Sequence, residues 1–422
     1  MISTMLKIKE NYLIFLALAI IIEIPVILAI VWMTGDYREP RFNIWPVTEW
    51  LVNYQGGFVR RGLIGEFLLT ISDPISGILP NLYRFVLSSY IFYIAIFFAV
   101  YALAKIKNIR VLILALLIQG GIYHMGISAD FYTRKENLFL IFFGFLCLLY
   151  INASKKVGES KKKRLLWLVS LPIIFGPILI LIHEAYLFMS FPLTAMLLFI
   201  VCKENPSYIY LRFGFVLYVG ICLIFFISCS IHHGDVVLAQ AIWDSLPWVD
   251  RVKLSPSAPY SQFAAISSIG WSLGQHLSTI YGVFITGGVY IWIFFILGNV
   301  LTLAVIASLI YPISAESRPK RIYGLLVIGL IVSSAMFLIA ADWGRWIAFM
   351  SNQLLLLMFA LSVSTFSKGE EKSKLILNLI KYTQKIAPKY LFYIVLVYGL
   401  VFQMPECCVQ YPNIFVFQSL FQ

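Results

Sequence analysis

The stretch KKKR-LLWLVSLPIIFGPILILI-HE, residues 161–184, determines the class of this protein. Its apolar centre, residues 165–182, carries no charge, and serine is its one hydroxyl residue. That length suits an α-helix crossing about 30 Å of hydrocarbon. Three lysines and an arginine precede it, and His183 and Glu184 follow it. We therefore expect a membrane-spanning helix whose two ends differ in charge.

The rest of the chain repeats this pattern. Of its 422 residues, 61% are hydrophobic and only 12% are charged, and the mean hydropathy is +0.88. This composition excludes a soluble globular chain and a disordered one. It predicts an all-α polytopic membrane protein, a single integral membrane domain over 1–422 with about 11 transmembrane helices. The expected spans lie near 12–33, 85–104, 111–128, 137–152, 165–182, 185–202, 213–231, 282–310, 323–341, 346–365 and 390–404.

The positive charges indicate an orientation. About two thirds of the 32 lysines and arginines fall on one side of these spans, which predicts that this side is cytoplasmic. The N-terminus is then cytoplasmic, and the odd number of spans places the tail 405–422 in the periplasm. The dense cluster at 155–164 is expected to contact anionic membrane lipid. The net charge of +12 is thus explained by topology, and no nucleic-acid partner is expected.

Two long outer loops carry the candidate chemistry. The first periplasmic loop, 34–84, contains segments 44–52 and 62–70, which have helical spacing and one apolar face and are expected to be interfacial helices. Between them, a glycine-rich turn ends in Arg60 and Arg61. Such a turn can present guanidinium groups to a phosphate. The alternative is a flexible hinge whose arginines contact lipid headgroups.

The second long periplasmic loop, 232–276, mixes aromatic rings with carboxylates. This composition suits a sugar-binding surface, and it equally suits an interfacial aromatic belt. The residues concerned are Trp243, Trp248, Tyr260 and Trp271, with Asp235, Asp244 and Asp250.

Cysteines do not indicate a metal site. Four of them lie within apolar runs and are expected to be packing residues. Cys407 and Cys408 lie on the outer tail, where one of them could pair with another chain or with a small thiol. The packing cysteines are Cys147, Cys202, Cys222 and Cys229.

Four groups of ionisable residues are expected where helices meet the outer surface. Because charged groups near a membrane are costly, several at one depth indicate a shared site. Local ion pairs at i,i+3 for Asp342–Arg345 and i,i+4 for Asp130–Arg134 are the structural alternative. The groups are Asp130 with Arg134 and Lys135, His183 with Glu184, His124, and Asp342 with Arg345.

This layout resembles the GT-C superfamily of membrane glycosyltransferases, which take a sugar from a polyprenyl-phosphate carrier. The resemblance rests on the large outer loop after the first span, its two short helices, the acids Asp36 and Glu39 at its start, and the arginines on the same face. It is architectural, without a diagnostic motif. The odd span number and outer C-terminus further resemble the bacterial O-antigen-modifying glucosyltransferases of the Gtr type.

The resemblance implies a set of roles. Asp36 would be the catalytic base, with Glu39 and Glu184 as the other candidate acids. The substrate-binding candidates are Arg60, Arg61, Asp130, Arg134, Lys135, His183, Asp342 and Arg345. The partners would be a polyprenyl-phosphate-linked sugar, such as glucose, and a polysaccharide acceptor, such as O-antigen, at the bacterial inner membrane. No cofactor is expected, and no motif indicates a metal or a divalent cation.

Two other classes remain open from the sequence. An O-antigen polymerase of the Wzy type is also multispanning and dependent on arginine, but it commonly has both termini in the cytoplasm. A membrane transporter would show inverted repeats and charges at the bilayer midplane.

Overall fold

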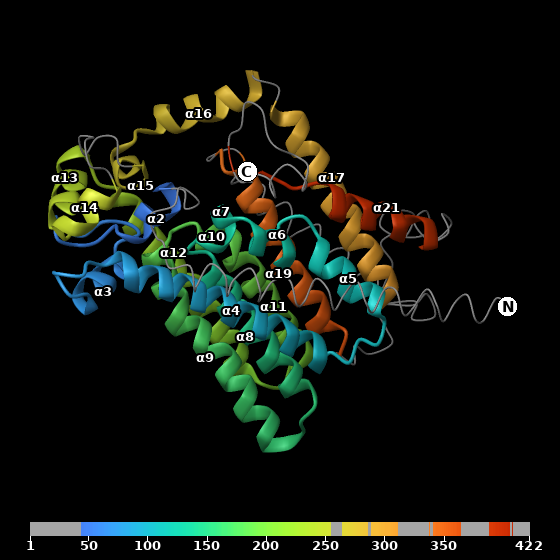
Figure 1. The fold of residues 1–422 in the computed structure, drawn as a ribbon. Helices are drawn as coiled ribbons and strands as arrows, with labels where there is room; N and C mark the ends of the chain where they lie inside the picture. Colours follow the sequence, from blue (N-terminus) through green and yellow to red (C-terminus); the bar gives the residue numbers. More distant parts are fainter. Residues whose placement is uncertain are drawn as a thin grey trace. The chain divides into compact units, whose positions relative to one another are not determined.

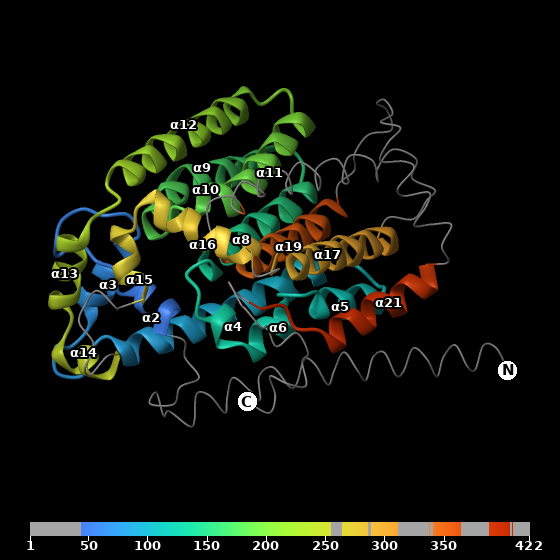
Figure 2. The ribbon, with the colours of Figure 1, turned by 90° about the horizontal axis from the view of Figure 1, so that it is seen from above.

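The computed structural model describes residues 44–254, 264–285, 288–310, 337, 341–363, 388–405 and 407. This part of the chain is helical (Figures 1 and 2), which supports the predicted class of all-α membrane protein. Six of its helices are long and apolar enough to cross a membrane. The expected span at 12–33 lies outside the described residues, as does that at 323–341 apart from residues 337 and 341. The six are α4 (Leu79–Leu103), α8 (Asn137–Ser154), α9 (Gly158–Ile182), α12 (Ile209–Ile231), α17 (Gly288–Ile310) and α19 (Trp343–Leu361).

Internal contacts divide the described chain into two compact units, where the sequence predicts a single domain. The first unit contains the described residues of 44–98 and 132–279, and the second contains 99–131 and those from 280 onward. Each unit has its own packed helices.

In the first unit, the four helices α8, α9, α11 (Phe191–Glu204) and α12 form an antiparallel set. Helix α9 packs against α8 and α12, and α11 packs against α12 and α9. The connections 155–157 and 205–208 are short, and short connections join antiparallel neighbours. The beginnings of α8 and α11 and the ends of α9 and α12 therefore lie at one end of the set, called here the site end. The cationic cluster 155–164 lies at the opposite end, where α8 is joined to α9 (Figure 1).

The expected span at 185–202 is not one helix. It is divided into α10 (Tyr186–Met189) and α11, and Ser190 lies between them. Pro192 is at the second position of α11, where the missing N–H of proline costs no intrahelical hydrogen bond. The break therefore follows from a proline that a hydropathy pattern counts as apolar.

The expected span at 111–128 is also divided. Helix α5 (Ile109–Leu117) and α6 (Ile122–Ile127) are separated by a turn in which Gly120 has φ +69°. That backbone conformation favours glycine, and α5 itself ends before it, at Leu117. The side chain of Asn352 donates a hydrogen bond of 2.7 Å to the Gly120 carbonyl oxygen, which satisfies part of the broken backbone.

Helix α17 is central to the second unit. It packs against α5, α19 and α21 (Pro388–Val401). Every residue of α19 is buried. A helix that is apolar or buried all round is typical of the interior of a membrane bundle.

Helix α2 (Ile44–Trp50) differs from its prediction as an interfacial helix, because Pro46 to Trp50 are all buried. Its Thr48 hydroxyl accepts a hydrogen bond from the backbone N–H of Ala265, and its Trp50 indole donates one to the Thr133 carbonyl oxygen. These contacts make α2 part of the core of the first unit. Helix α3 (Leu63–Ile71) keeps one face exposed and buries Ile64, Gly65 and Leu68.

Four cysteines have the packing role that the sequence predicts. They are free and buried: Cys147, Cys202, Cys222 and Cys229. Cys407 is disulfide-bonded, and Cys408 lies outside the described residues.

The second long loop forms a series of short helices. They are α13 (Val236–Ser245), α14 (Trp248–Leu254), α15 (Ala264–Ser267), the 3-10 helix η2 (Ser268–Gly270) and α16 (Leu273–Ile285), the last of which extends beyond the loop.

Candidate functional site

The glycine-rich turn between α2 and α3 is anchored at several points. The backbone N–H of Tyr54 and the side-chain amide of Gln55 donate to the Glu66 carboxylate, at 2.9 Å and 2.7 Å. A Cβ atom on Gly65 would collide with the Val52 carbonyl oxygen, so α3 can approach the preceding chain only with glycine there. These anchors disfavour the interpretation of the turn as a free hinge.

Arg61 ends this turn and is the most constrained arginine of the cluster. Its φ of 69° lies in the left-handed region, which is uncommon for a residue with a side chain. Its guanidinium binds the Glu184 carboxylate through several hydrogen bonds. Nε lies 3.0 Å and 2.9 Å from the two carboxylate oxygens, and Nη2 lies 2.6 Å from Oε1. Backbone strain of this kind costs of order 1–3 kcal/mol and persists only where surrounding contacts hold it.

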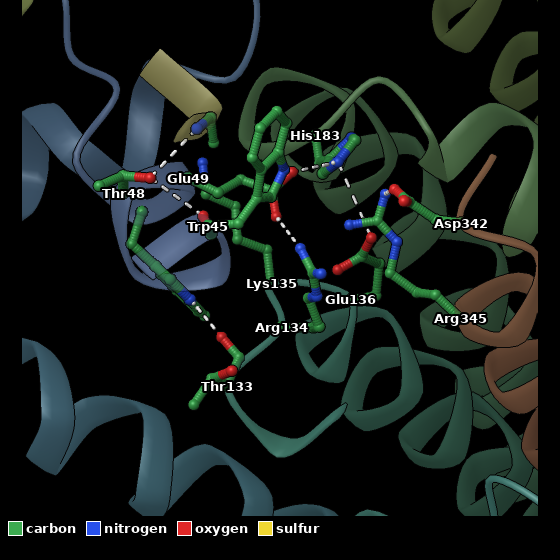
Figure 3. Close-up of polar contacts among 12 residues, drawn as sticks. Trp45, Thr48, Glu49, Thr133, Arg134, Lys135, Glu136, His183, Asp342 and Arg345 are labelled. Atoms are coloured by element: carbon green, nitrogen blue, oxygen red, sulfur yellow. Dashed lines mark hydrogen bonds and ion pairs between the residues drawn. The ribbon is translucent and has the colours of Figure 1, made fainter. Parts of the chain in front are cut away.

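Glu49 is the buried acceptor at the centre of the cluster (Figure 3). Its Oε1 lies 2.9 Å from His183 Nε2 and 3.5 Å from Arg61 Nη1, and its Oε2 accepts from Arg134 Nη1 at 3.2 Å. Helix α2 carries it inward to Arg134, which is 85 residues away in sequence. A carboxylate buried this deeply needs charged or hydrogen-bonding partners of this kind.

His183 is held in a defined orientation. Its Nδ1 accepts a hydrogen bond from the backbone N–H of Ala185 at 3.1 Å, so we assign the ring proton to Nε2, which faces Glu49. The ring is buried. His183 is therefore placed to orient carboxylates, and its predicted contact with a substrate stays a prediction.

Lys135, which the sequence predicts as a substrate ligand, binds backbone groups of the cluster. It is fully buried, and its ammonium donates to two backbone carbonyl oxygens, those of Arg61 at 3.0 Å and Ile182 at 3.3 Å. Burial lowers the pKa of Lys135 to about 8, against the opposing effect of Glu49 and the added effect of Arg61.

Arg60 lies at the edge of the cluster, with 17% of its side chain exposed. Its backbone N–H donates to the His232 carbonyl oxygen, and its Nη1 lies 3.4 Å from Glu184 Oε1. Its Nε is buried and has no hydrogen-bond partner within the part of the chain that the structure describes. Burial lowers the pKa of Arg60, an effect opposed by Glu184 and increased by Arg61. Arg60 is thus a cation whose carboxylate partner is already bound by another arginine.

Glu184 is a weak candidate for a general base. Burial alone would raise its pKa, but Arg61 and Arg60 outweigh burial and hold the pKa well below its usual range. A general base works best with a pKa near the operating pH. Glu184 is therefore an ionised partner of the arginines.

The cluster as a whole carries more positive than negative groups. It contains four basic side chains, three carboxylates and one histidine at the site end of the first unit. An excess of cations at a partly exposed edge is the arrangement that an anionic ligand needs. Its members are Glu49, Arg60, Arg61, Arg134, Lys135, Glu136, His183 and Glu184.

Members of two of the four predicted groups belong to this cluster, namely Arg134, Lys135, His183 and Glu184, whereas the other two groups lie in the second unit, as does Asp130. There Arg345 Nη2 lies 2.6 Å from Asp342 Oδ2, the i,i+3 pair that was the structural alternative, and the Arg345 guanidinium stacks on the Trp346 ring. His124 is buried, and its Nε2 lies 3.3 Å from the Leu117 carbonyl oxygen. One site shared by all four groups stays a prediction.

Other predicted site residues have less structural information. Asp130 belongs to the short helix α7 (Ala129–Tyr132), and its expected partner Arg134 binds Glu49. Asp36 and Glu39 lie outside the described residues.

The sequence reading missed Glu49 and Glu136. Glu49 stands alone among apolar residues of a short helix, and Glu136 follows Arg134 and Lys135 directly. A lone acid on an apolar segment is itself a signal, since ionised groups are rarely buried without partners. His183 Nε2 lies 3.8 Å from Glu136 Oε1 (Figure 3).

Carboxylates of the second long loop have structural roles. Asp250 accepts from the backbone N–H groups of Ile78 and Leu79 at the beginning of α4, and Asp235 caps α13. Capping satisfies the unpaired N–H groups of a helix N-terminus. These contacts favour a structural role over a sugar-binding surface for the two acids.

The class of this protein, an all-α membrane protein with a buried ionic cluster, rests on its own fold and site, because comparisons with known proteins add nothing to it. No family model matches the chain. No curated protein and no solved structure matches it either.

Proposed function

We propose that the chain is a membrane glycosyltransferase that moves a sugar from a polyprenyl-phosphate donor to a cell-surface polysaccharide such as O-antigen. The observation that carries the proposal is the environment of Arg60. Its guanidinium lies at the edge of the cluster, its Nε is buried without a described hydrogen-bond partner, and it shares the Glu184 carboxylate with Arg61. A phosphate at this edge would supply the missing acceptors.

Sugar transfer from such a donor needs two kinds of group. A carboxylate must take the proton of the acceptor hydroxyl, and a cation must stabilise the departing phosphate. Arg60 suits the second role, with Arg61 behind it. The base is assigned to Asp36, with Glu39 as the neighbouring acid, on the resemblance to the GT-C superfamily.

Changes at Arg60 test the phosphate contact. We expect Arg60→Ala to lower transfer by about 10²–10³-fold, the effect of removing one donor from a developing anion. Arg60→Lys should recover little, since a point charge does not reproduce a planar guanidinium. The measurement is transfer of radiolabelled sugar to the glycan in membranes, normalised to the amount of protein.

The matched control for this experiment is Arg212→Ala, which removes an exposed arginine whose guanidinium donates to the Pro206 carbonyl oxygen. It should transfer sugar at the wild-type rate. Wild-type transfer by Arg60→Ala would contradict the proposed phosphate site. The lipopolysaccharide of a deletion strain separates the classes: lost side-branches support a transferase, chains of a single repeat indicate a polymerase, and an unchanged profile indicates a transporter.

We further propose that the site end of the first unit faces the periplasm of a bacterial inner membrane, with a cytoplasmic N-terminus and a periplasmic C-terminus. The cationic cluster 155–164 supports this orientation, because positive residues favour the cytoplasmic side. Val157 between α8 and α9 and Val237 on α13 are 85% and 76% exposed. An impermeant maleimide should label Val237→Cys in intact spheroplasts and Val157→Cys only after lysis.

Wild-type protein gives the background labelling in that experiment, since its four described free cysteines are buried. Labelling of Val157→Cys alone in intact spheroplasts would reverse the orientation.

A further inference from the structure

We propose that Lys135 is a positioning residue of this site: its ammonium holds together the two backbone segments that carry Arg61 and Glu184, and so sets where the arginines meet an anionic phosphate. The phosphate as ligand rests on the proposed function. The positioning role rests on the contacts of Lys135 alone.

One ammonium reaches both sides of the same ion pair. Its Nζ lies 3.0 Å from the carbonyl oxygen of Arg61 itself and 3.3 Å from that of Ile182. Ile182 is the last residue of α9 and precedes Glu184 by two positions. Loss of this ammonium would free the backbone on both sides of the Arg61–Glu184 pair.

A cation stabilises both carbonyl groups. The carbonyls of the last turn of a helix lack intrahelical partners and carry the negative end of the helix dipole. Arg61 is held at φ 69°, so its peptide group needs contacts that fix it. Lys135 supplies a charge-assisted donor to each.

Burial separates this role from that of a ligand. Lys135 is 0% exposed, whereas the side chains of Arg60 and Arg61 are 17% and 18% exposed. A ligand at the edge therefore meets the arginines, and Lys135 acts through them.

Because Lys135 can lose its charge, the pH dependence of phosphate binding tests its role. Its pKa is lowered to about 8 by burial, and the charged groups that act on it are Glu49 on α2, Arg61, Glu184 after α9 and the adjacent Glu136. Above this pH the ammonium becomes an amine and loses the charge that strengthens its two hydrogen bonds. We therefore expect phosphate binding to weaken as the pH rises through 8.

The effect of Lys135 on global folding stability has the opposite dependence on pH. The folded pKa of Lys135 is below its ordinary value of 10.5, so the unfolded chain binds more protons between the two values. Titration of Lys135 then increases folding stability as the pH rises across that window. Weaker binding there cannot come from unfolding driven by Lys135.

The experiment uses the full chain in lipid nanodiscs and farnesyl phosphate, a short polyprenyl phosphate, as the probe. Its Kd is measured between about pH 6 and pH 10 for the wild type, Lys135→Met, Lys135→Arg and the exposed control Lys163→Met. The wild-type Kd should rise about tenfold or more across pH 8, an effect typical of a displaced binding group. Lys135→Met should bind weakly at every pH, Lys135→Arg should lose the transition near pH 8, and Lys163→Met should match the wild type.

A double variant distinguishes positioning from direct contact. If Lys135 acts through the arginines, adding Lys135→Met to Arg60→Ala should weaken binding far less than it does alone. Full additivity, or wild-type affinity and pH profile in Lys135→Met, would overturn the proposal.

Failure of the ligand assignment gives a different result. If the wild type does not bind farnesyl phosphate, the proposed function loses its support, and thermal unfolding of Lys135→Met, Glu184→Gln and the double variant decides the positioning role. Non-additive shifts of Tm support the role, and additive shifts overturn it.

Discussion

Replacement of Glu184 by alanine is expected to destabilise the folded protein by about 3–5 kcal/mol, the usual cost of removing one partner from a buried ion pair. Glu184 binds Arg61 through both carboxylate oxygens and lies 3.4 Å from Arg60. Without it, two largely buried guanidinium groups share the remaining acceptors. Thermal unfolding in detergent and the amount of protein in membranes measure the effect.

The matched control is Glu159→Ala. Glu159 is 89% exposed and pairs with Lys162 at 3.6 Å on the surface of α9, where such a pair contributes at most about 1 kcal/mol. Equal Tm values for the two variants would contradict the proposed role of Glu184.

Acid should affect the wild type and the variant differently. The folded pKa of Glu184 is held well below its ordinary value of 4.5 by Arg61 and Arg60, which outweigh the opposing effect of burial. Its contribution to stability is therefore complete above 4.5 and is lost as the pH falls through the folded pKa. Glu184→Ala should lack this acid-dependent part of the unfolding curve.

The helical bundle of the first unit was within reach of the sequence, because length and hydropathy suffice to place α8, α9 and α12. The two broken spans were not predicted. Gln119-Gly120-Gly121 stands in apolar surroundings, and its break depends on backbone conformation and on a partner, Asn352, that is more than 200 residues away. The break at Ser190 had a signal in Pro192, which a hydropathy pattern counts as apolar.

The site was predictable only in part. Arg134 precedes one apolar run, and His183 and Glu184 follow the next. Because successive spans run antiparallel, these residues are expected at the same end of the helices. Glu49 was missed because a short amphipathic helix was expected to turn its acid toward water, whereas α2 is buried. The role of Lys135 could not be predicted, since it depends on a carbonyl group 74 residues away in sequence.

Asp36→Asn is expected to lower sugar transfer by about 10²–10⁴-fold, the usual effect of losing a general base, while the protein accumulates as the wild type does. Asparagine is nearly isosteric with aspartate and cannot accept the proton of the acceptor hydroxyl. The structure adds a reason to look beyond the cluster for this base: Glu184 is bound by two arginines and remains ionised at neutral pH. Transfer rates per amount of protein are measured for Asp36→Asn, Glu39→Gln and Glu184→Gln.

The three variants separate the candidate acids. Loss of turnover in Asp36→Asn with retention in Glu39→Gln supports Asp36, and the reverse result assigns the base to Glu39. Glu184→Gln removes a partner of the arginines, so it should lower the amount of folded protein together with its activity. A stable Glu184→Gln protein without turnover, beside an active Asp36→Asn, would contradict the assignment of the base to Asp36 and place the essential acid within the cluster.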